Sequence, residues 1–138
     1  MEPYARRVEK PWGYELVWTE PGLPYAGKII HINAASRLSL QVHDAKTETW
    51  LLLSGRVMVT LEDDRGGLES FELQPGSGYT CNAGRKHRLV GITDCDILEV
   101  STPETGITHR LQDDYGRPDE VLGPTGVPGF PLATGPSA

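Results

Sequence analysis

Short apolar runs, separated by turns rich in glycine, proline and acidic residues, recur along most of the chain. In one of them, Val57, Val59 and Leu61 alternate with Met58 and Thr60, and this period of two indicates a half-buried strand. The pattern predicts strands at 15–18, 28–32, 38–43, 49–53, 57–61, 68–73, 79–82, 88–90 and 96–100. Many short strands with no long helical periodicity are typical of an all-β barrel or sandwich, and their number fits a jelly roll.

The chain divides into three regions by composition. Residues 1–25 are rich in aromatics and proline and predict an N-terminal arm with a short strand. Residues 26–117 carry the strand pattern and predict a single barrel. Residues 118–138 hold five prolines and four glycines, which indicates a flexible tail or a segment that packs on a neighbouring subunit.

Composition narrows the class of protein. With 138 residues the chain suits one domain, and a net charge of −6 argues against nucleic acid or an anionic membrane as partner. No apolar run approaches the ~18 residues of a membrane span, and the N-terminus lacks the apolar stretch of a signal peptide. Cys81 and Cys95 form no C-x-x-C pair, so we expect both to be reduced and the protein to be cytoplasmic.

Four residues have the spacing of a metal site. Gln41 and His43 are two apart and share one face of a strand, and Glu48 opens the next apolar run, so a hairpin brings the three together. His87 follows a turn later in the chain. This set of one amide, two imidazoles and one carboxylate predicts a divalent metal with one or two open positions, and Fe, Mn, Co, Ni and Zn all accept it. The alternative is that both histidines are ordinary strand residues.

The spacing resembles the two motifs of the cupin superfamily. The first motif reads Gln41-x-His43, four residues, Glu48, six residues, Gly55. The second reads Gly76, five residues, Asn82-x-Gly84, two residues, His87. Gln41 stands where cupins usually have a histidine, and Asn82 stands where they usually have a proline. The resemblance implies a double-stranded β-helix with the metal inside the barrel.

A narrower resemblance extends over roughly residues 9–117. The blocks that carry it are Lys10-Pro11-Trp12-Gly13, Lys28-Ile29-Ile30, Leu38-Ser39-Leu40-Gln41-x-His43, Glu48-x-Trp50, Gly84-x-x-His87-Arg88-Leu89, Leu98-Glu99-Val100 and Asp113-Asp114-Tyr115-Gly116-Arg117. This series is similar to the cupin domain of type II mannose-6-phosphate isomerases. The resemblance implies metal-dependent interconversion of an aldose and a ketose on a sugar phosphate. That family often carries a nucleotidyltransferase domain in front, for which 138 residues leave no room.

The chain departs from that family around the substrate. Ala45 and Lys46 stand where the family usually has a histidine and an arginine, and 105–107 replaces an acidic run. Arginine offers phosphate a planar two-pronged donor, whereas lysine is a point charge. We therefore expect the metal site to be retained better than phosphate recognition.

Lys28 and Glu99 are the candidate catalytic residues, and either one is a candidate for the base that moves a proton between the two carbons. Lys28, Ile30 and Ile32 occupy alternate positions of one predicted strand, so Lys28 faces the interior if the two isoleucines do. An ammonium group buried there needs an anion beside it. That anion is either a substrate group or Glu99. Glu99 lies between Leu98 and Val100 and is either a general base with a raised pKa or half of a structural ion pair.

Further candidates bind the substrate. Lys46, Arg85 and Arg88 offer cations to a phosphate or an acidic sugar, and Tyr79 offers a ring for stacking. By alternation Arg85 shares the face of His87, whereas Arg88 lies on the other face.

The sequence leaves three classes of function open. The first is the sugar or sugar-phosphate isomerase, the second a 2-His-1-carboxylate oxygenase that uses Fe(II) and O₂, and the third a sugar-binding protein without catalysis. We expect a homodimer that uses the N-terminal strand, because the aromatic and proline-rich arm needs a surface to cover.

Overall fold

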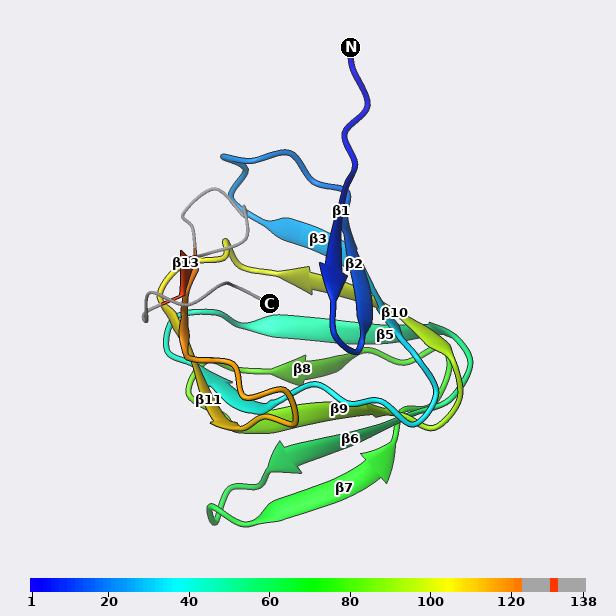
Figure 1. Cartoon of the computed structure of the whole chain (residues 1–138), viewed down its shortest axis with the longest axis vertical. Helices are drawn as coiled ribbons and strands as arrows, with labels where there is room; N and C mark the ends of the chain where they lie inside the picture. The colour runs from blue at the N-terminus through cyan, green and yellow to red at the C-terminus, as the bar shows by residue number, and fades with distance from the viewer. Residues whose placement is uncertain (123–129, 132–138) are drawn as a thin grey trace.

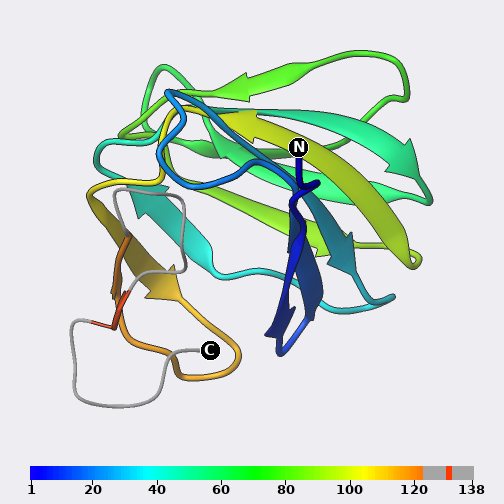
Figure 2. The ribbon, with the colours of Figure 1, turned by 90° about the horizontal axis from the view of Figure 1, so that it is seen from above.

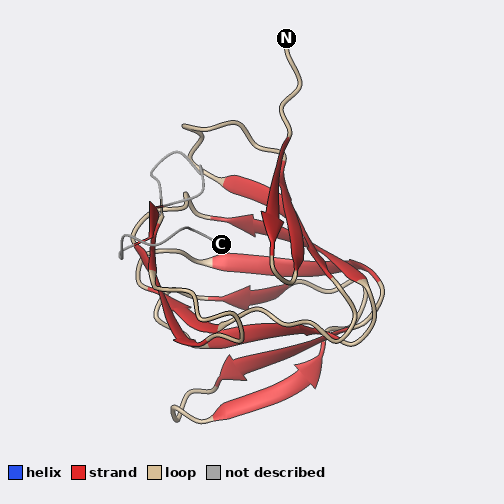
Figure 3. Cartoon of the chain, in the orientation of Figure 1, coloured by secondary structure: helices blue, strands red, loops and turns tan. Residues whose placement is uncertain are grey.

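The structure is a computed structural model, and it describes residues 1–122 and 130–131. Its strands form two antiparallel sheets, and its described residues contain no helix (Figures 1 and 3). The first sheet has the order β1 (Arg6–Lys10), β2 (Gly13–Val17), β3 (Ala26–Ile32), β10 (Cys95–Ser101), β5 (Glu48–Ser54), β8 (Tyr79–Cys81). The second has the order β13 (Phe130–Pro131), β12 (Glu120–Val121), β11 (Ile107–Gln112), β4 (Leu40–His43), β9 (His87–Gly91), β6 (Val57–Glu62), β7 (Leu68–Glu72).

The two sheets face each other, as the view from above shows (Figure 2), and the side chains between them form the core. Alternation along each strand decides which side chains point inward. In β5, Glu48, Trp50 and Leu52 are buried while the residues between them are half-exposed. Lys28 and Glu99 share the inward parity of Ile30 and Ile97 on neighbouring strands. The interior therefore has an apolar part and a charged part, and the charged part holds the candidate site.

The all-β jelly roll predicted from the pattern is confirmed. All nine predicted strands are present, with bounds that differ by no more than two residues. The pattern did not predict β1, β11 or β12, and these strands carry many charged or polar residues. The tail predicted over 118–138 begins inside the second sheet, because β12 pairs with β11. Residues 123–129 and 132–138 lie outside the described part of the chain.

Residues 1–25, predicted to be an arm, form one edge of the first sheet. β1 pairs with β2, and β2 pairs with β3. Gly13 begins β2 with φ of +154°, and an added Cβ there would clash with the carbonyl oxygen of His31 on β3. Glycine therefore allows the hairpin to lie close against β3. Across the described residues, the structure has no helix long and apolar enough to cross a membrane.

Candidate metal centre

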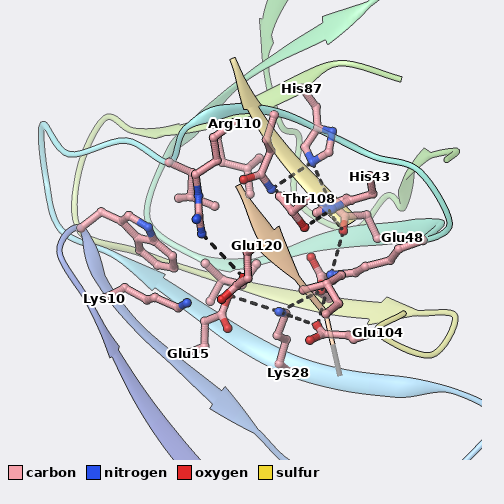
Figure 4. Close-up of a pocket in the computed structure, with 18 of the residues that line it drawn as sticks. Lys10, Glu15, Lys28, His43, Glu48, His87, Glu104, Thr108, Arg110 and Glu120 are labelled. Atoms are coloured by element: carbon pink, nitrogen blue, oxygen red, sulfur yellow. Dashed lines mark hydrogen bonds and ion pairs between the residues drawn. The ribbon is translucent and has the colours of Figure 1, made fainter. Parts of the chain in front are cut away.

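The predicted ligands converge at the inner face of the two sheets. Gln41 on β4 lies directly opposite His87 on β9, and His43 lies two residues along β4 on the same face. Glu48 begins β5 in the other sheet and points across at both histidines (Figure 4). The site is therefore held by three strands rather than by loops, which favours a fixed geometry.

The distances fit a site for one metal ion. His87 Nε2 lies 3.2 Å from Glu48 Oε1, and His43 Nε2 lies 3.4 Å from Glu48 Oε2. The three residues are buried, and one ligand atom from each lies within 4.8 Å of the others. No hydrogen bond of acceptable geometry reaches the buried Glu48 Oε2 from the described residues. One imidazole nitrogen beside each oxygen of a buried carboxylate fits a divalent cation better than a purely structural cluster.

Outer contacts orient both imidazoles. His43 Nδ1 lies 2.8 Å from Thr108 Oγ1, and His87 Nδ1 lies 3.0 Å from the carbonyl oxygen of Arg85. An Nδ1–H that donates to these oxygens leaves each Nε2 lone pair directed at Glu48. Outer partners of this kind are typical of metal-ligating histidines.

Gln41 lies beside the three ligands but turns its nitrogen toward them. Its Nε2 lies 3.3 Å from His43 Nε2 and 3.4 Å from His87 Nε2, while its Oε1 accepts a hydrogen bond of 2.7 Å from the Ser39 hydroxyl. A hydroxyl can accept as well as donate, so an amide rotated by 180° keeps the contact with Ser39. The rotated amide directs its oxygen at the site, as the predicted role in metal binding requires.

The protonation states depend on burial and on Glu48. Burial lowers the pKa of His43 to about 4 despite its contact with Glu48. Burial opposes charge on His87 as well, but Glu48 outweighs it and raises the pKa of His87 to about 10. Burial opposes charge on Glu48, but Lys46 and His87 hold its pKa well below the usual range. Without a metal, His87 is therefore the proton-bearing partner of Glu48, and a cation must displace that proton.

A buried network of charges adjoins the ligands. Lys46 Nζ lies 3.2 Å from carboxylate oxygens of Glu48, Glu99 and Glu104. Lys28 Nζ lies 2.7 Å from Glu104, 3.2 Å from Glu15 and 3.7 Å from Glu99. Two lysines thus face four carboxylates, and two negative charges are in surplus when all four are ionised and both histidines are neutral. A divalent cation held by His43, Glu48 and His87 would balance this surplus.

Glu99 differs from the other carboxylates of the network. Burial, and after it the charge of Glu48, raise the pKa of Glu99 to about 7, although Lys46 and Lys28 pull it down. For Glu104 burial also raises the pKa, but Lys28 and Lys46 outweigh it and the net shift is downward. Glu99 is therefore the group whose proton is most easily exchanged near neutral pH.

A cavity lies in front of the ligands, and its lining includes His43, Glu48 and His87. Three residues that the sequence suggested line it: Lys28 and Glu99, predicted to be catalytic, and Lys46, predicted to bind substrate. The sequence did not predict the lining residues that follow: Glu15, Glu104, Thr108, Arg110, Arg117 and Glu120. Glu15 could have been identified from the alternation along β2, because it lies at the same alternate positions as the buried Gly13 and Val17. Glu104 lies in a loop, where no such alternation exists.

Arg85, Arg88 and Tyr79, predicted to bind substrate, lie outside this cavity. β9 begins at His87, so alternation does not extend back to Arg85, which pairs with Asp64 at 3.1 Å. Arg88 lies on the opposite face from His87, where its Nε donates to the carbonyl oxygen of Leu38 at 2.9 Å.

Tyr79 packs on Phe71 with ring centroids 5.7 Å apart, and its hydroxyl accepts from the backbone N–H of Gln74. The ring is therefore occupied by core packing rather than open to a sugar.

Comparison with solved structures supports the fold. Oxalate decarboxylase from Bacillus subtilis superposes with a TM-score of 0.61 at 17% identity, covering 71% of this chain and 27% of that protein. The formate complex of the Lactobacillus farciminis oxalate decarboxylase gives 0.60 at 18% identity, with 71% and 30% covered. At this identity the likeness establishes the cupin fold alone.

Comparison with protein sequences identifies the family. The alginate biosynthesis protein AlgA of Pseudomonas aeruginosa is 30% identical over 131 residues, which cover 93% of this chain and 25% of AlgA. The xanthan biosynthesis protein XanB of Xanthomonas campestris pv. campestris strain B100 is 31% identical, with 83% and 24% covered. The mannose-1-phosphate guanylyltransferase of Escherichia coli K12 is 30% identical, with 81% and 23% covered.

The chain thus spans about a quarter of the length of these relatives. The family described as mannose-6-phosphate isomerase C-terminal matches residues 2–114, which include every predicted metal ligand. The cupin resemblance noted in the sequence is confirmed, and this chain belongs to the mannose-6-phosphate isomerase C-terminal family.

Proposed function

We propose that this chain is a metal-dependent isomerase that interconverts the aldose and ketose forms of a sugar phosphate. The observation that carries the proposal is the convergence of His43, Glu48 and His87 beside a buried lysine–carboxylate network in one cavity. Membership of a family described by mannose-6-phosphate isomerase supports the sugar phosphate as substrate.

The ligand residues would hold a divalent ion through two imidazole nitrogens and one carboxylate, with Gln41 as a fourth donor. The chemistry that such an ion would supply is Lewis-acid stabilisation of negative charge on the sugar oxygens. The chain's own residues move the proton. Glu99 in its ionised form takes it from one carbon and returns it to the neighbouring carbon, so the reaction releases no net proton.

Lys28 and Lys46 support this role of Glu99. Both ammonium groups lie within 3.7 Å of its Oε2. Burial opposes the charge of Lys28 and Lys46, but Glu104 and its neighbouring carboxylates outweigh burial and raise the pKa of both lysines. The lysines therefore remain cationic and stabilise negative charge that develops on the sugar oxygens.

The test is turnover by protein loaded with Mn²⁺, Co²⁺, Ni²⁺ or Zn²⁺ on a panel of hexose and pentose phosphates. We expect a ketose from an aldose phosphate and exchange of the proton on the second carbon with solvent deuterium. Absence of both across the panel would reject the isomerase. Oxygen consumption with Fe(II) would instead identify an oxygenase, and thermal stabilisation by a sugar without turnover would identify a binding protein.

A further inference from the structure

Arg110 lies next to the metal ligands although it belongs to a strand that the sequence pattern did not predict. On β11 it is directly opposite Gln41 of β4, which is itself opposite His87 of β9. Directly opposite residues point to one face of a sheet, so His87, Gln41 and Arg110 form a row across three strands. Adjacent strands lie about 4.8 Å apart, so this row spans about 10 Å.

The side chain of Arg110 is buried and only partly satisfied. It is 7% exposed, and its Nη1 donates to the carbonyl oxygen of Pro118 at 2.6 Å. Its Nη2 lies 3.7 Å from Glu120 Oε1, beyond hydrogen-bond distance. Its Nε is buried and has no hydrogen-bond partner among the described residues. An unpaired buried donor is costly, which indicates that this edge is kept for a partner that the chain does not supply.

Other arginines show what normally occupies that edge. Arg37, Arg56 and Arg117 each direct Nε and Nη2 at the two oxygens of one carboxylate, at 2.6–3.0 Å. Arg110 presents the same Nε–Nη2 edge without such a pair. Two parallel N–H donors fit the oxygens of a phosphate as well as those of a carboxylate.

Charges of both signs line the cavity around Arg110. Arg6, Lys10 and Arg117 line the same cavity, and Lys10 lies on the same side as Glu120 in Figure 4. Burial, and after it the nearby Arg117, lower the pKa of Arg110, although arginine remains charged. Carboxylates lie at this end as well, because Glu120 contacts Arg110 Nη2 and Asp113 is paired with Arg117. The Nε of Arg110 is the donor that these carboxylates leave without a hydrogen bond among the described residues.

We propose that Arg110 is a binding residue for the phosphate of the substrate, with the sugar lying along the row toward Gln41 and His87. The inference rests on the proposed function for the identity of the sugar phosphate, but the anion subsite itself does not require turnover. Lys46, at the position of the family's arginine, is already paired with three carboxylates. The anion subsite at Arg110 gives the phosphate a partner that does not depend on Lys46.

The test compares mannose 6-phosphate with mannose as probes, by titration calorimetry on metal-free protein. Wild-type protein is expected to bind the phosphorylated sugar more tightly. Arg110→Met is expected to weaken binding of mannose 6-phosphate about tenfold to a hundredfold, since it removes charged hydrogen bonds, and to leave mannose unaffected. Arg110→Lys keeps the charge but lacks the planar edge. Its affinity for mannose 6-phosphate is expected to lie between those of wild type and Arg110→Met.

The matched control is Arg56→Met, which removes one positive charge from an exposed pair with Glu72 outside the cavity. Thermal unfolding checks that each variant is folded, and Arg110→Lys carries the test if Arg110→Met is not. The subsite is rejected if both Arg110 variants keep wild-type affinity for mannose 6-phosphate, or if Arg56→Met weakens it equally. It is also rejected if wild-type protein prefers neither probe.

Failure of the subsite differs from failure of the proposed function. Binding of mannose 6-phosphate that depends on Arg110, without formation of fructose 6-phosphate by metal-loaded protein, rejects the isomerase and retains the subsite. Turnover with a KM for mannose 6-phosphate that is insensitive to Arg110→Lys rejects the subsite and retains the isomerase.

Discussion

The chemistry of the site depends on single atoms of two histidines. Thr108 and the carbonyl of Arg85 bind the Nδ1 atoms, so each Nε2 is directed at Glu48. A lone histidine in a strand pattern does not reveal this orientation. The spacing of Gln41, His43, Glu48 and His87 indicated the cluster because the spacing constrains four residues at once.

Replacement of a ligand should abolish metal binding. In His87→Ala we expect less than about a tenth of the metal retained by the wild-type protein, because three-coordinate sites lose their fixed geometry when one ligand is removed. Elemental analysis after gel filtration measures the metal, and the rise in melting temperature on metal addition gives a second readout. His109→Ala is the control, because His109 pairs with Asp119 outside the cavity. Equal metal contents in both variants would contradict the site.

Glu99 should make the stability of the metal-free protein depend on pH. Its pKa is raised from the usual 4.5 to about 7, chiefly by burial. The folded state therefore holds the proton more tightly than the unfolded state, and this contribution to stability is lost as pH rises from about 4.5 to 7.

Glutamine does not titrate, so the variant Glu99→Gln does not lose this contribution as pH rises. We expect its free energy of unfolding, relative to that of wild type, to increase between pH 5 and pH 8. Urea unfolding at several pH values in the presence of a chelator measures the difference, and parallel stability curves for the two proteins would contradict it.

At the scale of the elements, hydrophobic patterning predicted the strands that carry apolar residues at every second position. It failed for β1 and β11, where Arg6 and Arg110 point to a charged part of the interior that an apolar pattern cannot reveal. Alternation predicted correctly that Arg88 lies on the opposite face from His87. It failed for Arg85, because the strand begins only after that residue.

The loop between β10 and β11 contributes the buried Glu104, which no pattern in the sequence indicated. Glu104 bridges Lys28 at 2.7 Å and Lys46 at 3.2 Å. Loops have no period, so a buried carboxylate there becomes visible only when its partners are known. Glu104 directly precedes residues 105–107, at which the chain departs from its resemblance to the family.

Removal of the Glu104 charge should destabilise the fold. Glu104→Gln removes the carboxylate nearest to Lys28, which also contacts Lys46, and a hydrogen bond between charged groups is worth about 1.5–3 kcal/mol. We expect this loss in the free energy of unfolding measured with urea. Glu72→Gln, in an exposed pair with Arg56, serves as the control and should change stability little. A loss no larger than that of the control would show that Glu104 is not required to balance Lys28 and Lys46.

At the scale of the whole molecule, the unpaired edge of the first sheet bears on assembly. β1 is the last strand of that sheet, and no described strand pairs with its outer edge. An open edge is a template for a strand of another molecule, and a two-fold axis places two copies of one strand antiparallel. With the axis at Val8, Arg7 of one copy lies opposite Glu9 of the other, so the edge is complementary to itself.

We therefore expect a homodimer joined through β1, as the N-terminal segment had indicated. Light scattering at micromolar concentration should give twice the 15.1 kDa mass of the chain. Glu9→Arg places like charges opposite each other across the axis and should shift the dimer toward monomer, because opposed like charges destabilise strand pairing. Glu20→Arg makes the same change of charge in an exposed turn and should leave the dimer intact. A wild-type protein that is monomeric at this concentration, or a dimer equally insensitive to both substitutions, would reject assembly through this edge.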